Sequence, residues 1–173
     1  MGVWVTEVRR AAPRFLRLFA GRLRDSDARE VLGATGTPRG AIAGHLAREI
    51  SEAVSGGGRV WAVMDGARPL ALFGARPDSL TADTAAIWML ATREADARPL
   101  EFARLSRRCL GTVFRAFPEA DTFHNWVPEG AERTVAWLRW LDAWLSVRDR
   151  FVSPWTGELF THFAIEREEV CHV

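Results

Sequence analysis

The sequence predicts an α/β fold in which helices cover both faces of a mixed, mostly antiparallel and twisted sheet. Two apolar runs, residues 59–64 and 69–75, are joined through Asp65-Gly66, a dipeptide typical of a β-hairpin turn. A third apolar run, 85–92, is short and bounded by polar residues, which indicates a strand buried on both faces. Predicted strands and helices alternate after it, as they do in α/β domains.

The composition fits one domain that spans residues 1–173. Of the 173 residues, 48% are hydrophobic, which is enough for a sizeable core. The formal net charge is +1, so we expect no nucleic-acid partner, and no apolar run is long enough to cross a membrane. Every basic residue is Arg, and Lys, Gln and Tyr are absent, a bias that suggests a GC-rich coding sequence. The abundance of Arg is therefore not by itself a sign of phosphate binding.

The two cysteines form neither a disulfide framework nor a metal site. Cys109 falls in the middle of a predicted helix, and Cys171 is next to His172 in a charged tail, without the spacing of zinc ligands. Two unpaired cysteines fit a reducing compartment, and the sequence shows no signal peptide. We therefore expect a cytoplasmic protein without a bound metal.

The first third of the chain predicts one strand followed by helices. In order, we expect a strand at 3–8, a helix from Pro13, a short helix through Val31-Leu32, a loop at 33–40 and a helix at 41–54. Asp25-Ser26-Asp27 breaks the first helix and offers a cap for the second. The glycines at 56–58 end the last helix, and without a following Lys-Ser/Thr they are not a P-loop.

The segment 85–117 is the centre of the predicted fold. The strand at 85–92 leads into a charged turn, 93–98, and Pro99 suits the first turn of a helix that runs over 100–117. The free N–H groups and the dipole at the start of this helix attract a phosphate or another anion. The alternative interpretation is an ordinary strand–turn–helix unit with a solvated charged turn.

The last third predicts a strand at 122–127, a helix at 131–145, an extended segment at 146–152, a turn at 153–158 and a strand at 159–165. On the helix, Trp137, Trp140 and Trp144 are spaced by three and four residues, so they form a stripe beside the leucines that face the sheet. One interpretation is a thick core with Trp155 folded over the stripe. The other is a surface for a second copy or a different protein.

The order of these elements resembles the GNAT superfamily of acyl-CoA-dependent N-acetyltransferases. Several short motifs are similar to those of a bacteriophage-encoded GNAT-like family: Asp65-Gly66, Leu72-Phe73-Gly74, Ile87-Trp88-Met89-Leu90, Leu105-Ser106-Arg107-Arg108, Phe117-Pro118, Asn125-Trp126-Val127, Val135-Ala136-Trp137-Leu138 and Pro154-Trp155-Thr156-Gly157-Glu158. The resemblance implies acetylation of an unidentified amine, in the cytoplasm of a bacterial host. The alternative is a non-catalytic binding or structural component of a phage particle, associated with the virion.

The resemblance also implies where acetyl-CoA would bind. Its pantetheine arm would run along Leu90, Ala91 and Thr92, with Asn125 contacting it from the next strand. Its pyrophosphate would meet the turn that holds Arg93, Ala97 and Arg98. Two features depart from the superfamily: Glu94 and Asp96 stand where small residues are usual, and the chain has no Tyr to protonate the leaving thiolate.

Three residues are candidates for the catalytic roles. Glu94 and His124 are candidate bases for deprotonating an ammonium, and Thr134 is the hydroxyl nearest to the place of the missing Tyr. Each also has an ordinary structural interpretation. Glu94 would be a solvated charge, His124 a packed or surface residue, and Thr134 a helix residue bonded to its own backbone.

Overall fold

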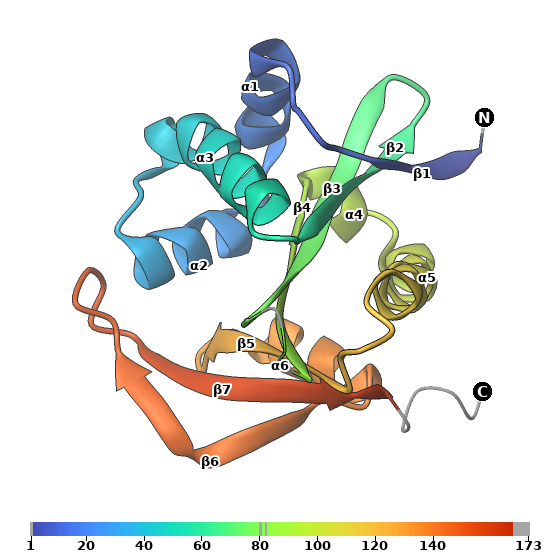
Figure 1. The fold of residues 1–173 in the computed structure, drawn as a ribbon. Coiled ribbons are helices and arrows are strands. Elements are labelled where there is room, and N and C mark those ends of the chain that lie inside the picture. Colours follow the sequence, from blue (N-terminus) through green and yellow to red (C-terminus); the bar gives the residue numbers. More distant parts are fainter. Residues whose placement is uncertain (1, 80, 82, 168–173) are drawn as a thin grey trace.

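The computed structural model describes residues 2–79, 81 and 83–167, and these form a seven-stranded sheet with helices on both faces (Figure 1). The strands are β1 (Val3–Glu7), β2 (Arg59–Asp65), β3 (Arg68–Pro77), β4 (Thr84–Ala91), β5 (Thr122–Pro128), β6 (Trp144–Val152) and β7 (Leu159–Glu166). The helices are α1 (Pro13–Arg22), α2 (Asp25–Thr35), the short 3-10 helix η1 (Arg39–Ala41), α3 (Ile42–Ser55), α4 (Arg93–Asp96), α5 (Pro99–Ala116) and α6 (Glu132–Trp140).

The sheet order is β1-β2-β3-β4-β5-β7-β6. Every neighbouring pair is antiparallel except β4 and β5, which run parallel. The Asp65-Gly66 turn joins β2 to β3, and Gly66 has the positive φ of 58° that such a turn needs. The predicted mixed, mostly antiparallel α/β fold is therefore confirmed.

Two cores lie on opposite faces of the sheet because side chains alternate along each strand. Val60 and Ala62 of β2 face a core shared with α1, α2 and α3, in which Phe19 is fully buried. Trp61 and Val63 face the other core, which α5 and α6 cover. In Figure 1 the first three helices and α5 lie on opposite sides of β2, β3 and β4. A fully buried Phe or Leu side chain stabilises the fold by about 1.5–3 kcal/mol, so both layers are held mainly by apolar burial.

The parallel strands β4 and β5 separate along most of their length. β4 pairs with β3 along its whole length, from Ala85 to Ala91. With β5 it pairs only from Thr84 to Ala86, after which β5 continues alongside β7. The two parallel strands therefore diverge from Ile87 onward and leave a gap in the middle of the sheet.

Four expectations for residues 25–98 are corrected. Helix α2 continues to Thr35, through part of the predicted loop at 33–40. Asp27 does not cap it: Arg24 is the residue before the helix, and Asp27 is buried in its first turn. Ile87 and Met89 of β4 are half-buried rather than buried on both faces, because β5 has moved away from them. The turn at 93–98 contains the short helix α4.

Helix α6 is shorter than predicted, since it ends at Trp140 and not at 145. Asp142 follows with a φ of 65°, a left-handed conformation that Asp adopts more readily than most residues. The chain turns there into β6, so Trp144 and Leu145 belong to a strand. The prediction that Trp137, Trp140 and Trp144 share one helical stripe is therefore wrong.

The three tryptophans have separate environments. Trp137 is half-buried, and its Nε1 donates to Ser106 Oγ at 2.9 Å. The ring of Trp140 lies 4.3 Å from the guanidinium carbon of Arg107 and is 42% exposed. Trp144 lies on the sheet and is 44% exposed. Of these three tryptophans, only Trp140 and Trp144 are therefore substantially exposed to solvent.

Trp155 does not fold over α6. It lies against Gly36 at the end of α2, where a Cβ would come within 2.7 Å of the indole. Gly36 has a φ of 72°, so glycine is required there both for space and for backbone conformation. The predicted pair Cys171 and His172 lies outside the described residues. Within the described ranges, no helix combines the length and the apolar character that crossing a membrane requires.

Candidate functional site

A cleft occupies the gap between β4 and β5. Both faces of the sheet contribute to it: α2 lies on one side and α5 and α6 on the other. Its walls are mostly apolar, with a few polar groups. The polar and titratable side chains that line it are Arg24, Asp27, Glu30, Ser106, Cys109, Asn125 and Thr134.

Asn125 marks the point where the two strands part. Its Nδ2 donates to the carbonyl oxygen of Ile87 at 2.6 Å, and its Oδ1 accepts from the N–H of Trp126 at 2.8 Å. Along β4, the backbone groups of successive residues point alternately toward β3 and away from it. The carbonyl of Ile87 points away from β3, so the N–H and C=O of Met89, two residues later, also point away from β3 and into the gap. Since pairing with β5 has already ended, Met89 offers one donor and one acceptor to an extended ligand.

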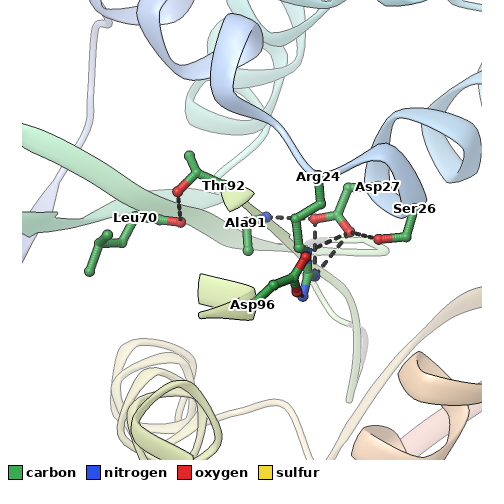
Figure 2. A network of polar contacts seen from close by, with 7 residues as sticks. All are labelled: Arg24, Ser26, Asp27, Leu70, Ala91, Thr92 and Asp96. Carbon is green, nitrogen blue, oxygen red and sulfur yellow. Dashed lines mark hydrogen bonds and ion pairs between the residues drawn. The ribbon is translucent and has the colours of Figure 1, made fainter. Parts of the chain in front are cut away.

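The next outward-facing residue of β4, Ala91, is already satisfied (Figure 2). Its N–H donates to Asp27 Oδ2 at 2.6 Å, and its carbonyl oxygen accepts from the N–H of Arg24 at 3.0 Å. Leu90 and Thr92 are buried beside it, and Thr92 N–H donates to the carbonyl of Leu70. Of the predicted arm-binding residues, Ala91 thus has both backbone groups engaged, and the open part of the edge lies at Met89.

Asp27 is the centre of a buried polar network at the start of α2. Its carboxylate accepts from Nε and Nη2 of Arg24 at 3.0 and 3.1 Å and from the Ser26 hydroxyl at 3.0 Å, as Figure 2 shows. Burial raises the pKa of Asp27, while Arg24 and the N–H of Ala91 act in the opposite direction. This network fixes the start of α2 against the end of β4.

Glu30 lies one turn further along α2 and lines the cleft. It is half-buried, and no described residue forms a hydrogen bond or an ion pair with its carboxylate. Burial, and secondarily the charge of Asp27, raise the pKa of Glu30 to about 8. Reasoning from the sequence missed this residue. The one available signal was the spacing of three residues that puts it on the same helix face as Asp27.

Thr134 lines the cleft from α6, on the opposite face of the sheet. Elsewhere in the described chain, Thr35 and Thr112 donate their hydroxyls to carbonyls four residues earlier in their helices, at 2.7 and 3.0 Å. The hydroxyl of Thr134 forms no such bond with any described residue and remains available to a ligand. The structure thus brings Thr134 and Asn125 together with Glu30.

A second hollow lies beside the turn between β4 and α5. Glu94, Ala97 and Arg98 line it, and Arg93 is exposed nearby. Glu94 forms an ion pair with Arg22. Burial opposes ionisation of Glu94, but hydrogen bonds from Thr92 and Arg22 outweigh it and lower its pKa.

The second carboxylate of this turn also has a cationic neighbour. Asp96 Oδ1 lies 3.5 Å from Nη1 of Arg24. Because each of the two carboxylates, Glu94 and Asp96, has an arginine beside it, their repulsion of an anion at this turn is reduced.

His124 is on the sheet face away from α5 and does not line the cleft. Its Nε2 lies 2.8 Å from Asp78 Oδ2, and its Nδ1 lies 3.1 Å from Nε2 of His162. It is therefore held between two polar side chains, at the narrow end of the gap. In the part of the chain that the structure describes, no group of three or more His, Cys, Asp or Glu side chains is placed to hold a metal ion.

Solved structures with a similar fold include several acetyltransferases. Spermidine N-acetyltransferase from Vibrio cholerae in complex with CoA and spermine is 12% identical, with 97% of each chain covered and a TM-score of 0.70. A probable acetyltransferase from Staphylococcus epidermidis is 5% identical, with 96% of this chain and 99% of that one covered and a TM-score of 0.69. Ribosomal-protein-alanine N-acetyltransferase from Brucella melitensis is 9% identical, with 94% and 99% covered and a TM-score of 0.66.

At these identities the similarity shows the fold alone, and it confirms the predicted GNAT-like architecture. No protein-family model matches the sequence, and no curated protein matches it. The resemblance to a phage-encoded branch of the superfamily stays a prediction.

Proposed function

We propose that this protein is an acyl-CoA-dependent N-acetyltransferase that acts on an amine. The observation that carries the proposal is the gap between β4 and β5, where the backbone of Met89 faces an apolar cleft without a strand partner. A pantetheine arm is an extended chain with two amides, so it can form strand-like hydrogen bonds with such an edge. The V. cholerae neighbour of the same fold was solved with CoA bound.

The residues of the cleft fit an acyl donor of this kind. Acetyl-CoA would supply an acetyl group activated as a thioester. The N–H of Met89 is a donor for the oxygen that becomes negatively charged during transfer. Asn125 stabilises the divergence of the strands through its bond to Ile87. The free hydroxyl of Thr134 takes the donor role that the missing Tyr would have had near the leaving sulfur.

The pyrophosphate would bind at the turn between β4 and α5. Arg93 and Arg98 are exposed there, and the pairing of Glu94 with Arg22 reduces the charge that would repel an anion. Arg supplies several donors in a fixed geometry that matches phosphate oxygens. The bound cofactor would then be flanked by residues whose side chains form no hydrogen bond with it: Leu90, Ala91, Thr92 and Ala97.

The test is calorimetric titration with acetyl-CoA, followed by assays of thiol release with a panel of amines. The panel begins with polyamines and with peptides that have a free N-terminal alanine, the classes named for the neighbours. Arg93→Ala combined with Arg98→Ala should weaken acetyl-CoA binding about tenfold or more, whereas Arg17→Ala on the exposed side of α1 should not. No heat of binding at millimolar acetyl-CoA would refute the proposal.

A non-catalytic role remains the second candidate function, and two observations favour it. The sequence contains no Tyr, and both backbone groups of Ala91 are engaged within the chain. In this proposal the protein is a GNAT-fold component of a phage particle or a homo-oligomer, with contacts through Trp140 and Trp144, the two of the three tryptophans that are exposed. Light scattering of Trp140→Ala and Trp144→Ala tests it: loss of an assembly supports it, and a monomeric wild type without a copurifying partner excludes it.

A further inference from the structure

We propose that Glu30 is the proton acceptor of the acetyl transfer, and that the acceptor substrate enters the cleft as an ammonium cation. This inference rests on the proposed function and assigns a catalytic residue and a substrate charge to the same site. It comes from the position of Glu30 in the cleft and from its lack of a partner.

The position of Glu30 is fixed by the start of α2. Arg24 and Asp27 are both bonded to Ala91, which ties the first turn of α2 to the end of β4. One turn later, Glu30 extends into the cleft from the face of the sheet that α1, α2 and α3 cover. Thr134 lines the cleft from the opposite face. A proton acceptor and a hydroxyl donor therefore lie on the two sides of the gap in which the thioester would sit.

The charges around Glu30 do not balance its own. The other titratable groups that line the cleft are Arg24, Asp27 and Cys109. The positive charge of Arg24 acts to lower the pKa of Glu30, but Arg24 is hydrogen-bonded twice to Asp27 and not to Glu30, and burial and the charge of Asp27 outweigh it. Burial raises the pKa of Cys109 to about 12, so this thiol stays neutral. An ammonium group is the kind of ligand that supplies the missing positive charge, and the aromatic side chain of Trp88 lines the same cleft.

The protonation behaviour of Glu30 suits a base. Its pKa of about 8 lies near the pH at which an amine is still mostly charged. A bound ammonium lowers that pKa, because an opposite charge favours the carboxylate. The two bases considered from the sequence are less suitable. The pKa of Glu94 is lowered beside Arg22, and His124 is held by Asp78 and His162 outside the cleft lining.

The step balances in protons and bonds. The Glu30 carboxylate takes one proton from the ammonium, which frees the nitrogen lone pair. The nitrogen then bonds to the thioester carbonyl carbon, and the carbon–sulfur bond breaks. The thiolate sulfur receives the second amine proton through the Thr134 hydroxyl, which gives up one proton and accepts another. Glu30 returns its proton to solvent, so the net products are the amide, the free thiol and one proton.

The first arm of the test compares Glu30→Gln with Glu52→Gln, an exposed glutamate of α3, as the matched control. With an amine that the wild type acetylates, Glu30→Gln should lower kcat/KM by about 100-fold or more. It should also remove the rise in rate that the wild type shows as pH approaches about 8, while acetyl-CoA affinity stays the same. Activity within about threefold of the wild type, with that rise intact, would overturn the inference and leave the proposed function standing.

The second arm does not need activity. A carboxyl-carbon NMR titration should show one glutamate that titrates near pH 8 in the wild type and in Glu52→Gln, and is missing from Glu30→Gln. If Glu30 titrates at the ordinary pKa of about 4.3, the inference is wrong even if the enzyme is active. If acetyl-CoA neither binds nor reacts, the proposed function and the assignment of Glu30 fall together.

Discussion

Replacing Asp27 by alanine should strongly destabilise the protein, although the same change two residues earlier should not. Asp27 is 3% exposed and accepts hydrogen bonds from Arg24, Ser26 and the backbone N–H of Ala91. Asp27→Ala leaves the Arg24 guanidinium without its bidentate partner and the N–H of Ala91 without an acceptor. Removing one partner of a buried charge pair costs about 3–5 kcal/mol of unfolding free energy.

Asp25 provides the matched control. It lies in the same first turn of α2, so both substitutions remove a negative charge from the same helix N-terminus. Its own partner is Arg39, at 2.6 Å, but the Asp25 side chain is 80% exposed. An exposed ion pair contributes about 0–1 kcal/mol, so Asp25→Ala should change the unfolding free energy by no more than that.

Urea unfolding followed by tryptophan fluorescence measures both variants. With a denaturant slope of about 2 kcal/mol per molar, Asp27→Ala should lower the midpoint by roughly 1.5–2.5 M and Asp25→Ala by less than about 0.5 M. Asp27→Asn should fall between them, because the amide oxygen can still accept from Ala91. Equal midpoints for the two alanine variants would refute the role assigned to the buried network.

Three further predictions concern the packing of the fold. Gly33→Ala should destabilise by about 1–3 kcal/mol, since its Cβ would lie 2.8 Å from the ring of Phe160, whereas Gly21→Ala in open space on α1 should be neutral or stabilising in the same urea assay. Arg167→Ala should lower the unfolding free energy by about 1.5–3 kcal/mol. The reason is that the guanidinium of Arg167 donates to three carbonyl oxygens at and just beyond the end of α5. An unchanged melting temperature would contradict this prediction. In a Cys171→Ser background, Cys109 should react with a thiol reagent at pH 8 only as fast as the protein unfolds locally. The reason is that Cys109 is buried and its pKa is raised to about 12. Immediate labelling of the folded protein would contradict this prediction.

Sequence reasoning predicted well those elements whose limits are marked by local chemistry. Asp65-Gly66 gave the hairpin, Pro99 the start of α5 and Gly56 the end of α3. It failed where the marker was absent. Helix α6 ends before Asp142 without a Gly or Pro, so the hydrophobic spacing of the tryptophans appeared to continue into what is a strand.

The site was predictable only in part, for a related reason. The family resemblance pointed to β4 and to the turn at 93–98, but it placed the binding edge at Leu90 to Thr92, whereas the open backbone groups are those of Met89. It also singled out Thr134 and Asn125, which do line the cleft. Sequence reasoning could not identify Glu30. What distinguishes this residue is that its carboxylate has no hydrogen-bond or ion-pair partner among the described residues once α2 has packed against β4. Such a property belongs to contacts between segments about 60 residues apart, such as Asp27 with Ala91, and no local pattern encodes them.

The position of β7 has a consequence for the order in which the protein can assemble during synthesis. β7 is the last strand of the sheet in the chain, yet it lies between β5 and β6. Strands β1 to β4 can pair as soon as they leave the ribosome, because each neighbour in the sheet is already available. β5 gains its long antiparallel partner only when β7 emerges, and β7 is also the one strand among the described residues that pairs with β6. Until then the nascent chain holds an incomplete sheet in which Phe123 and Val127 of β5, buried in the finished protein, lack their cover from β7.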